Sequence, residues 1–388
     1  MAACTLLAVT SARATDGYFD IGFGVKAKGA GGVGVALPQD ALAPATNPAG
    51  ISFLPSRVDV GATWFKVDRG ASLGGASFDG NQTSSFFIPE LGVTHHLSNR
   101  FALGLAIYGN GGLNTDYTTP IPAFGTTNAG IDLTQIFVAP TVAFAINPRH
   151  SIGLSPVLAY QRFKAKGLEN FGVTNSEYDN SYGAGVRIGY SGEITDWLSA
   201  GATYQSRTYA SKFGKYKNLF AEQGDFDIPS NFAVGVAVKP VRKLTLAVDV
   251  ERILFSEVKS VGNPLNAQTF GNGLGASDGP GFGWNDVTVV KAGALYGATD
   301  QLTLRVGYNY STQAVPNDQT FFNILAPAVV QHHLTLGLTF AATQHIELSA
   351  LYAHAFEHDV KGSGNFNNGD ANLHMSQDSV GIAVGYLF

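Results

Sequence analysis

The connections between the apolar segments of this chain alternate between short turns and long loops. Each segment has about 9 to 12 residues, the length that a tilted strand needs to cross a bilayer. Transmembrane β-barrels have short periplasmic turns and long external loops, whereas a soluble propeller or sandwich has no reason for this asymmetry. The short turns are residues 98–100, 147–149, 195–197, 239–243, 299–301 and 343–345, and the long loops are 115–131, 166–180, 211–227, 256–285, 312–330 and 359–377.

Within the segments, apolar residues occupy every second position. The last segment has Val380, Ile382, Val384, Tyr386 and Phe388 on one face, and glycine and alanine on the other. This period of two indicates strands with one face toward lipid. Fourteen segments start near residues 58, 84, 101, 132, 151, 181, 198, 228, 244, 286, 302, 331, 346 and 378. We therefore expect an all-β fold, a fourteen-stranded antiparallel transmembrane barrel with both chain ends on the periplasmic side.

Composition excludes two other classes. Only 14% of the residues are charged, against roughly 25% in soluble domains. No run of about 18 apolar residues occurs, so helical membrane spans are excluded. The net charge of −5 gives a nucleic-acid partner no electrostatic support.

The first fourteen residues resemble the end of a secretory leader. A short apolar stretch precedes Ala12, Arg13 and Ala14, a small-x-small pattern that predicts cleavage after Ala14. No Lys or Arg precedes the apolar stretch, so either the recorded start is truncated or the leader is unusual. The sole cysteine, Cys4, lies in this segment, and we expect no thiol or disulfide chemistry in the mature chain.

Residues 15–56 do not alternate and form a separate element before the barrel (57–388). This stretch is rich in Gly and Ala and carries scattered apolar residues. A fourteen-stranded lumen is wide enough to need a plug if it is not to be an open water channel. Because its apolar side chains would be poorly placed in water, we expect this segment to fold into the lumen.

Several stretches resemble the FadL/TodX family of outer-membrane hydrophobe transporters. The glycine run Gly29, Gly31, Gly32 and Gly34 is followed by residues 36–40 (ALPQD) and then by the sequence Asn-Pro-Ala-Gly at residues 47–50, as in the family's N-terminal hatch. Residues 228–231 (IPSN) and 278–284 (DGPGFGW) resemble two further stretches of that family. The match is specific over the hatch, whereas over the barrel it depends on strand count, parity and these two patches.

The resemblance implies a monomeric barrel with an internal hatch and passive, substrate-driven uptake of hydrophobic small molecules. It leaves open whether these are long-chain fatty acids or aromatic hydrocarbons. The expected substrate-binding and hatch residues are Phe19, Phe23, Asn47, Pro48, Ala49, Gly50 and Phe53. Expected partners are the substrate, outer-membrane lipid and lipopolysaccharide, and the outer-membrane assembly machinery, whose C-terminal recognition signature Phe388 resembles. No cofactor is expected.

Charged residues in the inward register have two interpretations. One is an ion-pair network that lines the lumen and holds the hatch, which we favour because both signs are interspersed. The other is recognition of a substrate carboxylate by a basic side chain. The candidates for that role are Arg187, Arg207, Lys291 and Arg305.

Three neighbouring segments contain residues that disturb strands. Pro89 lies in the second segment and Pro140 in the fourth, while Gly109, Asn110, Gly111 and Gly112 end the third. A proline cannot donate a ladder hydrogen bond, and glycine clusters mark bulges. We therefore predict a lateral opening beside the third strand, formed by Pro89 and the Gly109–Gly112 residues, consistent with the sideways exit proposed for the family. The alternative is a glycine-initiated loop with tolerated prolines, such as Pro156 in the fifth segment.

Other chemical motifs support no enzyme, metal site or nucleotide site. Gly29-x-Gly31-x-x-Gly34 matches a dinucleotide fingerprint, but no strand clearly precedes it and no alternating βα units follow. His354-x-x-Glu357-His358 matches an inverted zinc-protease pattern, but on a strand the two histidines would lie about 13 Å apart. The remaining alternative functions are a general porin for polar solutes, which leaves the apolar N-terminal segment unexplained, and an outer-membrane enzyme or adhesin.

Overall fold

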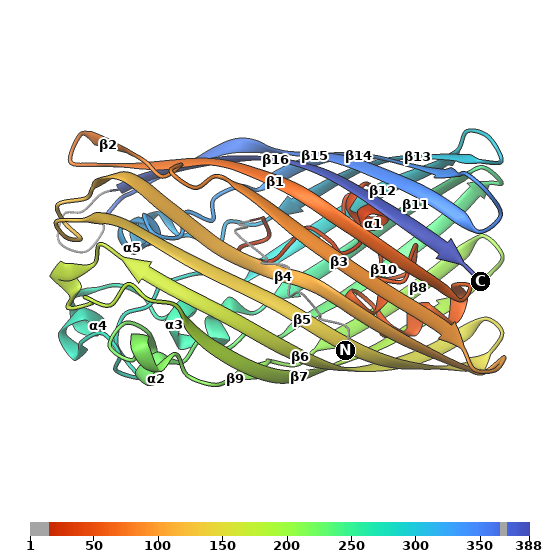
Figure 1. Ribbon diagram of the computed structural model, residues 1–388, viewed down its shortest axis with the longest axis horizontal. Coiled ribbons are helices and arrows are strands. Elements are labelled where there is room, and N and C mark those ends of the chain that lie inside the picture. Colours follow the sequence, from red (N-terminus) through yellow and green to blue (C-terminus); the bar gives the residue numbers. More distant parts are fainter. Residues whose placement is uncertain (1–14, 365–370) are drawn as a thin grey trace, which may run out of the picture.

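The computed structural model describes residues 15–364 and 371–388, and the expected cleavage after Ala14 lies outside them. One antiparallel sheet closes on itself as a barrel (Figure 1), because β1 pairs with β16 along its whole length, from Arg57 opposite Leu387 to Leu73 opposite Ala371. Closure leaves no unpaired edge strand in hydrocarbon. No helix in the described ranges is long and apolar enough to span a membrane.

Fourteen long strands form the wall, which confirms the strand count. They are β1 (Arg57–Leu73), β3 (Ser85–His96), β4 (Phe101–Pro120), β5 (Asn128–Asn147), β6 (His150–Lys166), β7 (Asp179–Glu193), β8 (Leu198–Gln205), β10 (Asn231–Val241), β11 (Leu244–Ile253), β12 (Val287–Gly297), β13 (Leu302–Ser311), β14 (His332–Ala341), β15 (Ile346–Lys361) and β16 (Ala371–Leu387). Two short strands, β2 (Ala76–Asp79) and β9 (Tyr209–Ala210), pair with β1 and β7, respectively.

Short helices lie in the N-terminal segment and in the long loops. In the N-terminal segment they are α1 (Val25–Lys28), η1 (Ala43–Ala45) and η2 (Pro48–Phe53). In the loops they are η3 (Glu169–Phe171), η4 (Gly214–Tyr216), α2 (Ala221–Gly224), η5 (Phe255–Glu257), α3 (Lys259–Gly262), α4 (Ala267–Asn272), η6 (Asn317–Gln319) and α5 (Thr320–Asn323). Figure 1 shows α2, α3, α4 and α5 at one end of the barrel and the C-terminus at the other.

The two faces of the strands follow the predicted alternation. In β16, Val380, Ile382, Val384 and Tyr386 point outward and are at least 43% exposed. Inward positions of the same barrel are occupied by small or polar residues, many of them buried beneath the N-terminal segment. An apolar outer surface is what a strand needs to lie in lipid, because lipid tails solvate it better than water does.

Several strands are longer than the sequence predicts. The predicted loop 115–131 is largely strand, because β4 continues to Pro120 and β5 begins at Asn128. The predicted loop 359–377 also belongs mostly to β15 and β16, apart from residues 365–370, which lie outside the described ranges. On the outer face these extensions are largely polar, with Asn372, His374 and Ser376 in β16, so an apolar lipid-facing stripe does not mark them as strand.

The N-terminal segment lies inside the barrel, where the red ribbon of Figure 1 runs between the walls. Its side chains are almost all buried from Thr15 to Ile51, although the segment has little regular structure of its own. A segment without a ladder must satisfy its backbone groups by other means. The wall of the barrel provides many of those partners.

Candidate functional site

Three carboxylates of the wall hold the N-terminal segment by its backbone. Asp59 of β1, Glu90 of β3 and Asp249 of β11 point inward and are at most 5% exposed. Each accepts hydrogen bonds from backbone amides, from Ala41 to Asp59 (2.9 Å), from Val25 to Glu90 (2.8 Å), and from Gly34 (2.7 Å) and Val35 (2.9 Å) to Asp249. Charge-assisted bonds of this kind are stronger than bonds between neutral groups.

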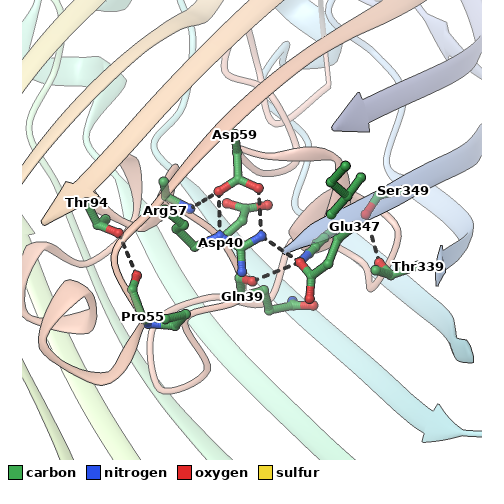
Figure 2. Close-up of polar contacts among 12 residues, drawn as sticks. Gln39, Asp40, Pro55, Arg57, Asp59, Thr94, Thr339, Glu347 and Ser349 are labelled. Carbon is green, nitrogen blue, oxygen red and sulfur yellow. Dashed lines mark hydrogen bonds and ion pairs between the residues drawn. The ribbon is translucent and has the colours of Figure 1, made fainter. Parts of the chain in front are cut away.

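An ion-pair network connects the segment to β1 and β15, the two strands that flank β16 (Figure 2). The Arg57 guanidinium donates to both oxygens of Asp59 (2.7 Å each) and to Glu347 of β15 (2.6 Å). Lys26 of α1 forms an ion pair with the same Glu347 carboxylate. Charges of opposite sign therefore compensate one another in a largely buried place, which is the condition for tolerating them there.

Glycines of the wall let the segment approach closely. A Cβ added to Gly307 would lie 1.9 Å from the Gly31 nitrogen, and one added to Gly337 would lie 2.9 Å from the Gly29 Cα. Such distances are shorter than any real Cβ contact. The glycine run that matches a dinucleotide fingerprint thus packs backbone against backbone. Similar approaches occur at Gly92, Gly153, Gly189, Gly201 and Gly293.

Asn47 joins two parts of the segment to β7. Its side-chain amide donates to the carbonyl oxygens of Val35 (2.7 Å) and Tyr190 (2.8 Å), and its Oδ1 accepts from the amide of Ala49 (3.1 Å). Asn47 is therefore the N-cap of η2, in which Pro48 occupies the first helical position. Ala49 and Gly50 are buried within η2, whereas Phe53 at its end is half-buried.

Four of the predicted site residues line one small internal cavity. Phe19, Phe23, Arg187 and Lys291 contribute to it, together with Asp249 and Glu251. Its volume is about 20 Å³, which is room for about one water molecule. The cavity brings aromatic rings and basic groups together, the two features that a fatty-acid site would need.

The four basic candidates all have partners. Arg187 donates to the carbonyl oxygens of Pro44 and Ala45, and Lys291 pairs with Glu251 at 2.9 Å. Arg305 donates to Gln39 (2.9 Å) and Thr339 (2.7 Å). Arg207 lies beyond the end of β8, not in a strand, and pairs with Asp227 (2.7 Å) and Asp225 (3.4 Å). Binding of a substrate carboxylate by any of the four stays a prediction.

The wall has a break between β3 and β4. These strands pair only from Leu91 opposite Ile107 to His96 opposite Ala102. Residues 85–90 of β3 continue to pair with β1, and residues 108–116 of β4 pair with β5. In the described residues no ladder joins the two stretches until Asp116, whose backbone bonds with Gly80 and Gln82.

N-terminal residues bond to β4 at this break from the lumen. The Asp20 amide donates to the carbonyl oxygen of Asn110, and the Gly112 amide donates to that of Tyr18, each at 3.1 Å. Phe19 and Gly111 form the corresponding bridge. Tyr18 and Asp20 are not among the residues predicted from the sequence, where the only signal for them is their position beside Phe19.

The disturbed residues are placed partly as predicted. Pro89 lies in the part of β3 that β4 does not pair with. The glycine run does not end the third strand, which continues to Pro120; instead the register shifts between Gly109 and Gly111, as in a β-bulge. Pro140 is not at the break: it lies where the β5–β6 ladder is interrupted, a stretch that also contains Pro156, and the register is the same on both sides.

Aromatic side chains fill the interior on the loop side of this break. Tyr18 packs against Phe255 (ring centroids 5.1 Å apart) and Trp284 (5.8 Å). Further out, the loops enclose a small apolar cavity of about 30 Å³. Its walls include Ile131, Phe163, Phe171, Leu219, Phe282 and Phe322. Loop aromatics carry no strand pattern, so the sequence analysis did not select them.

A large concavity lies on the outer wall. It has a volume of about 670 Å³ and is lined by Phe101, Val142, Phe144, Ile152, Leu154, Ile188, Tyr190 and Tyr204. These are side chains of the apolar outer face, which lipid covers in a membrane. We therefore do not assign this concavity to the transported substrate.

Comparisons with known proteins agree with this architecture. The family model described as outer membrane protein transport protein (OMPP1/FadL/TodX) matches residues 20–387. The toluene transporter TodX of Pseudomonas putida is similar over 95% of this chain and 99% of its own, with a TM-score of 0.75 and 15% identity. No curated protein matches in sequence.

Two further solved structures have the same fold. The toluene transporter TbuX of Ralstonia pickettii covers 95% of this chain and 99% of its own length, with a TM-score of 0.68 and 18% identity. A FadL homologue of Pseudomonas aeruginosa covers 96% and 99%, with a TM-score of 0.71 and 14% identity. At these identities the likeness is one of fold.

Proposed function

The chain belongs to the FadL/TodX family of outer-membrane transport proteins, and we propose that it lets fatty-acid-like or aromatic small molecules enter the cell passively. The observation that carries this proposal is the combination of a filled lumen with a break in the wall. A general porin needs an open aqueous channel, and neither the family nor the filled lumen favours that alternative.

In this proposal the long loops face the cell exterior and both chain ends face the periplasm. The loop aromatics that line the outer apolar cavity capture the hydrophobic molecule, because transfer of apolar surface out of water is favourable. The barrel works as a monomer, made of residues 57–388, after removal of residues 1–14. The assembly machinery inserts it among outer-membrane lipids and lipopolysaccharide.

Residues 15–56 act as the hatch. Their bonds to Asp59, Glu90 and Asp249 hold the closed state, and Asn47 with its Pro-Ala-Gly sequence anchors the hatch to β7. The substrate passes the cavity lined by Phe19 and Phe23 when the hatch rearranges. Arg187 or Lys291 would face a carboxylate there if the substrate carries one.

The exit leads sideways through the wall between β3 and β4. An apolar molecule gains nothing by entering the aqueous periplasm, whereas a gap in the wall returns it to lipid. A backbone group without a hydrogen-bond partner costs several kcal/mol in hydrocarbon, so a gap in the ladder is not expected in a barrel wall without a function. Pro89 and residues 109–112 lie in the stretch where β3 and β4 no longer pair, which supports this route.

Flux measurements with the purified protein in liposomes test the function. We expect entry of a labelled long-chain fatty acid or of toluene to increase over protein-free liposomes, without osmotic swelling in a small sugar. Swelling at general-porin rates with no gain in hydrophobe flux would contradict the proposal. Mass spectrometry of lipids extracted from the gently purified protein would then identify which hydrophobe it carries.

A further inference from the structure

The outward face of β6 changes character along the strand. Residues Ile152, Leu154 and Leu158 are apolar and exposed, and Tyr160 follows them. The next three outward positions are Arg162, Lys164 and Lys166. Successive outward positions are about 7 Å apart. The strand therefore presents, in order, a surface for lipid tails, an interfacial aromatic ring and a row of three cations.

Two of these cations share one aromatic ring. The Arg162 guanidinium lies 4.2 Å from the ring centroid of Tyr178, and the Lys164 ammonium lies 4.8 Å from it. The Tyr178 hydroxyl donates to Asp132 of β5 at 2.6 Å. The ring thus holds both side chains in place on the outer surface through cation–π contacts.

The cations of this face differ in their partners. Lys166 pairs with Asp116 at 2.6 Å, and Lys215 pairs with Glu177 at 2.7 Å. In the described part of the chain, Arg162 and Lys164 have no carboxylate at ion-pair distance, and Asp132 is bonded to the Tyr178 hydroxyl. Arg162 and Lys164 thus carry two positive charges on the outward face of β6, beside the single negative charge of Asp132.

We propose that Arg162, Lys164 and Tyr178 form a binding site for a phosphate of the lipopolysaccharide lipid anchor. This rests on the proposed orientation, in which the end of β6 at Lys166 faces outside. Arg and Lys donors suit phosphate oxygens. The anchor's acyl chains would lie along Leu158 and the rings of Tyr160 and Tyr182, whose centroids are 5.5 Å apart. A membrane lipid, and not free phosphate, matches this sequence of tail, interface and charge.

Two other cations of the outer wall, Lys66 and Arg252, each lie beside a carboxylate. Arg252 of β11 bonds to Thr288 (2.8 Å) and pairs with Asp286 (3.5 Å). Lys66 of β1 is the neighbour of Asp378 in the β1–β16 ladder. Substitution of Lys66 and Arg252 by glutamine supplies a matched control, because it also removes one lysine and one arginine charge from the outer wall.

Binding of lipid A to the full-length protein in mild detergent, followed by native mass spectrometry, tests the site. The bisphosphorylated lipid A should bind the double variant Arg162→Gln/Lys164→Gln at least tenfold more weakly than the wild type. The control Lys66→Gln/Arg252→Gln should change the affinity less than twofold. The exchange Arg162→Lys/Lys164→Arg should retain binding within about threefold of the wild type.

Three results would overturn the proposal. These are equal binding by the Arg162→Gln/Lys164→Gln variant, equal binding of dephosphorylated lipid A to the wild type, or competition by millimolar inorganic phosphate alone that matches lipid A. Hydrophobe flux into liposomes without lipopolysaccharide separates this site from transport. We expect the double variant to transport as the wild type does, so a failure of wild-type flux would count against the proposed function and not against this site.

Discussion

The backbone amide of Gly112 in β4 donates a hydrogen bond to the carbonyl oxygen of Tyr18, 3.1 Å away. At this point β4 has no ladder partner in β3, so a residue of the hatch takes the place that a wall strand would occupy. The hydrogen bonds that hold residues 18–20 against β4 therefore also occupy backbone groups of β4 that β3 leaves unpaired. Movement of residues 18–20 would free the backbone of β4 at the break.

A disulfide across the break should block exit. A Cβ at Gly109 would lie 3.1 Å from the Ile88 Cγ2, so Ile88→Cys/Gly109→Cys places two thiols within bridging reach. We expect hydrophobe flux to fall at least fivefold on oxidation and to recover with reductant. The control is Val93→Cys/Leu105→Cys, a pair in the intact ladder. Full flux through a verified Ile88–Gly109 crosslink would rule out this route.

Removal of the hatch should open the lumen. Deletion of residues 15–56 takes away the groups that bond to Asp59, Glu90 and Asp249 and leaves a fourteen-stranded wall around water. We expect a severalfold rise in single-channel conductance in planar bilayers. An unchanged small conductance of the correctly folded deletion variant would show that the segment plugs nothing.

Loss of the Asn47 side chain should loosen the hatch. Asn47→Ala leaves the Val35 and Tyr190 carbonyl oxygens without this donor, and each unsatisfied buried group costs about 1–3 kcal/mol. We expect more small-solute leakage and faster proteolysis of the segment. The control is Asn170→Ala, an exposed asparagine that also donates to a carbonyl oxygen. If leakage and uptake are both unaffected, Asn47 has at most a role in folding.

Much of this fold can be predicted from the sequence, because strand alternation and turns depend on residues that are close together in the chain. Alternation and turn chemistry gave the strand number and the outward face of residues such as Ile382, which is 65% exposed. The break between β3 and β4 depends instead on pairing between distant residues, and Pro89 and Gly111 only hint at it. The bond between Tyr18 and Gly112 could not be predicted from the sequence, because it joins two backbone groups and does not depend on either side chain.

The role of the inward charges cannot be predicted from the sequence in the same way. Strand register can place a carboxylate on the inward face, but the bonds of Asp249 and Glu90 to hatch amides depend on how an irregular segment folds in the lumen. The basic candidates had the same limitation. Arg207 was assigned to a strand because its neighbours alternate, whereas β8 ends at Gln205.

The hatch should be held more tightly at low pH. Burial and, to a smaller extent, the nearby Asp59 raise the pKa of Asp40 to about 7 against the lowering effect of Lys26. Burial also raises the pKa of Asp16 to about 7. Both values exceed the ordinary 3.8, so the docked hatch binds protons that the undocked one releases. Docking is therefore most stable below about pH 4 and weakens as the pH rises through 7.

We expect leak conductance to increase between pH 5 and pH 8. The double variant Asp16→Asn/Asp40→Asn should remain at the low-pH level throughout, and the exposed control Asp318→Asn should behave as the wild type. A leak that falls with rising pH, or a pH dependence that persists in the double variant, would show that other groups control the hatch.

A side chain at Gly307 should displace the hatch without touching any charge. The Cβ of Gly307→Val would lie 1.9 Å from the Gly31 nitrogen and 2.1 Å from the Ala30 carbonyl carbon. Backbone on both sides leaves no flexible group to move, so the segment itself must shift. We expect a raised conductance with an intact, heat-resistant barrel. Gly297→Val is the matched control, since the nearest atom to its added Cβ is 3.9 Å away. Equal conductance of the two variants would mean that contact at Gly307 does not hold the hatch in place.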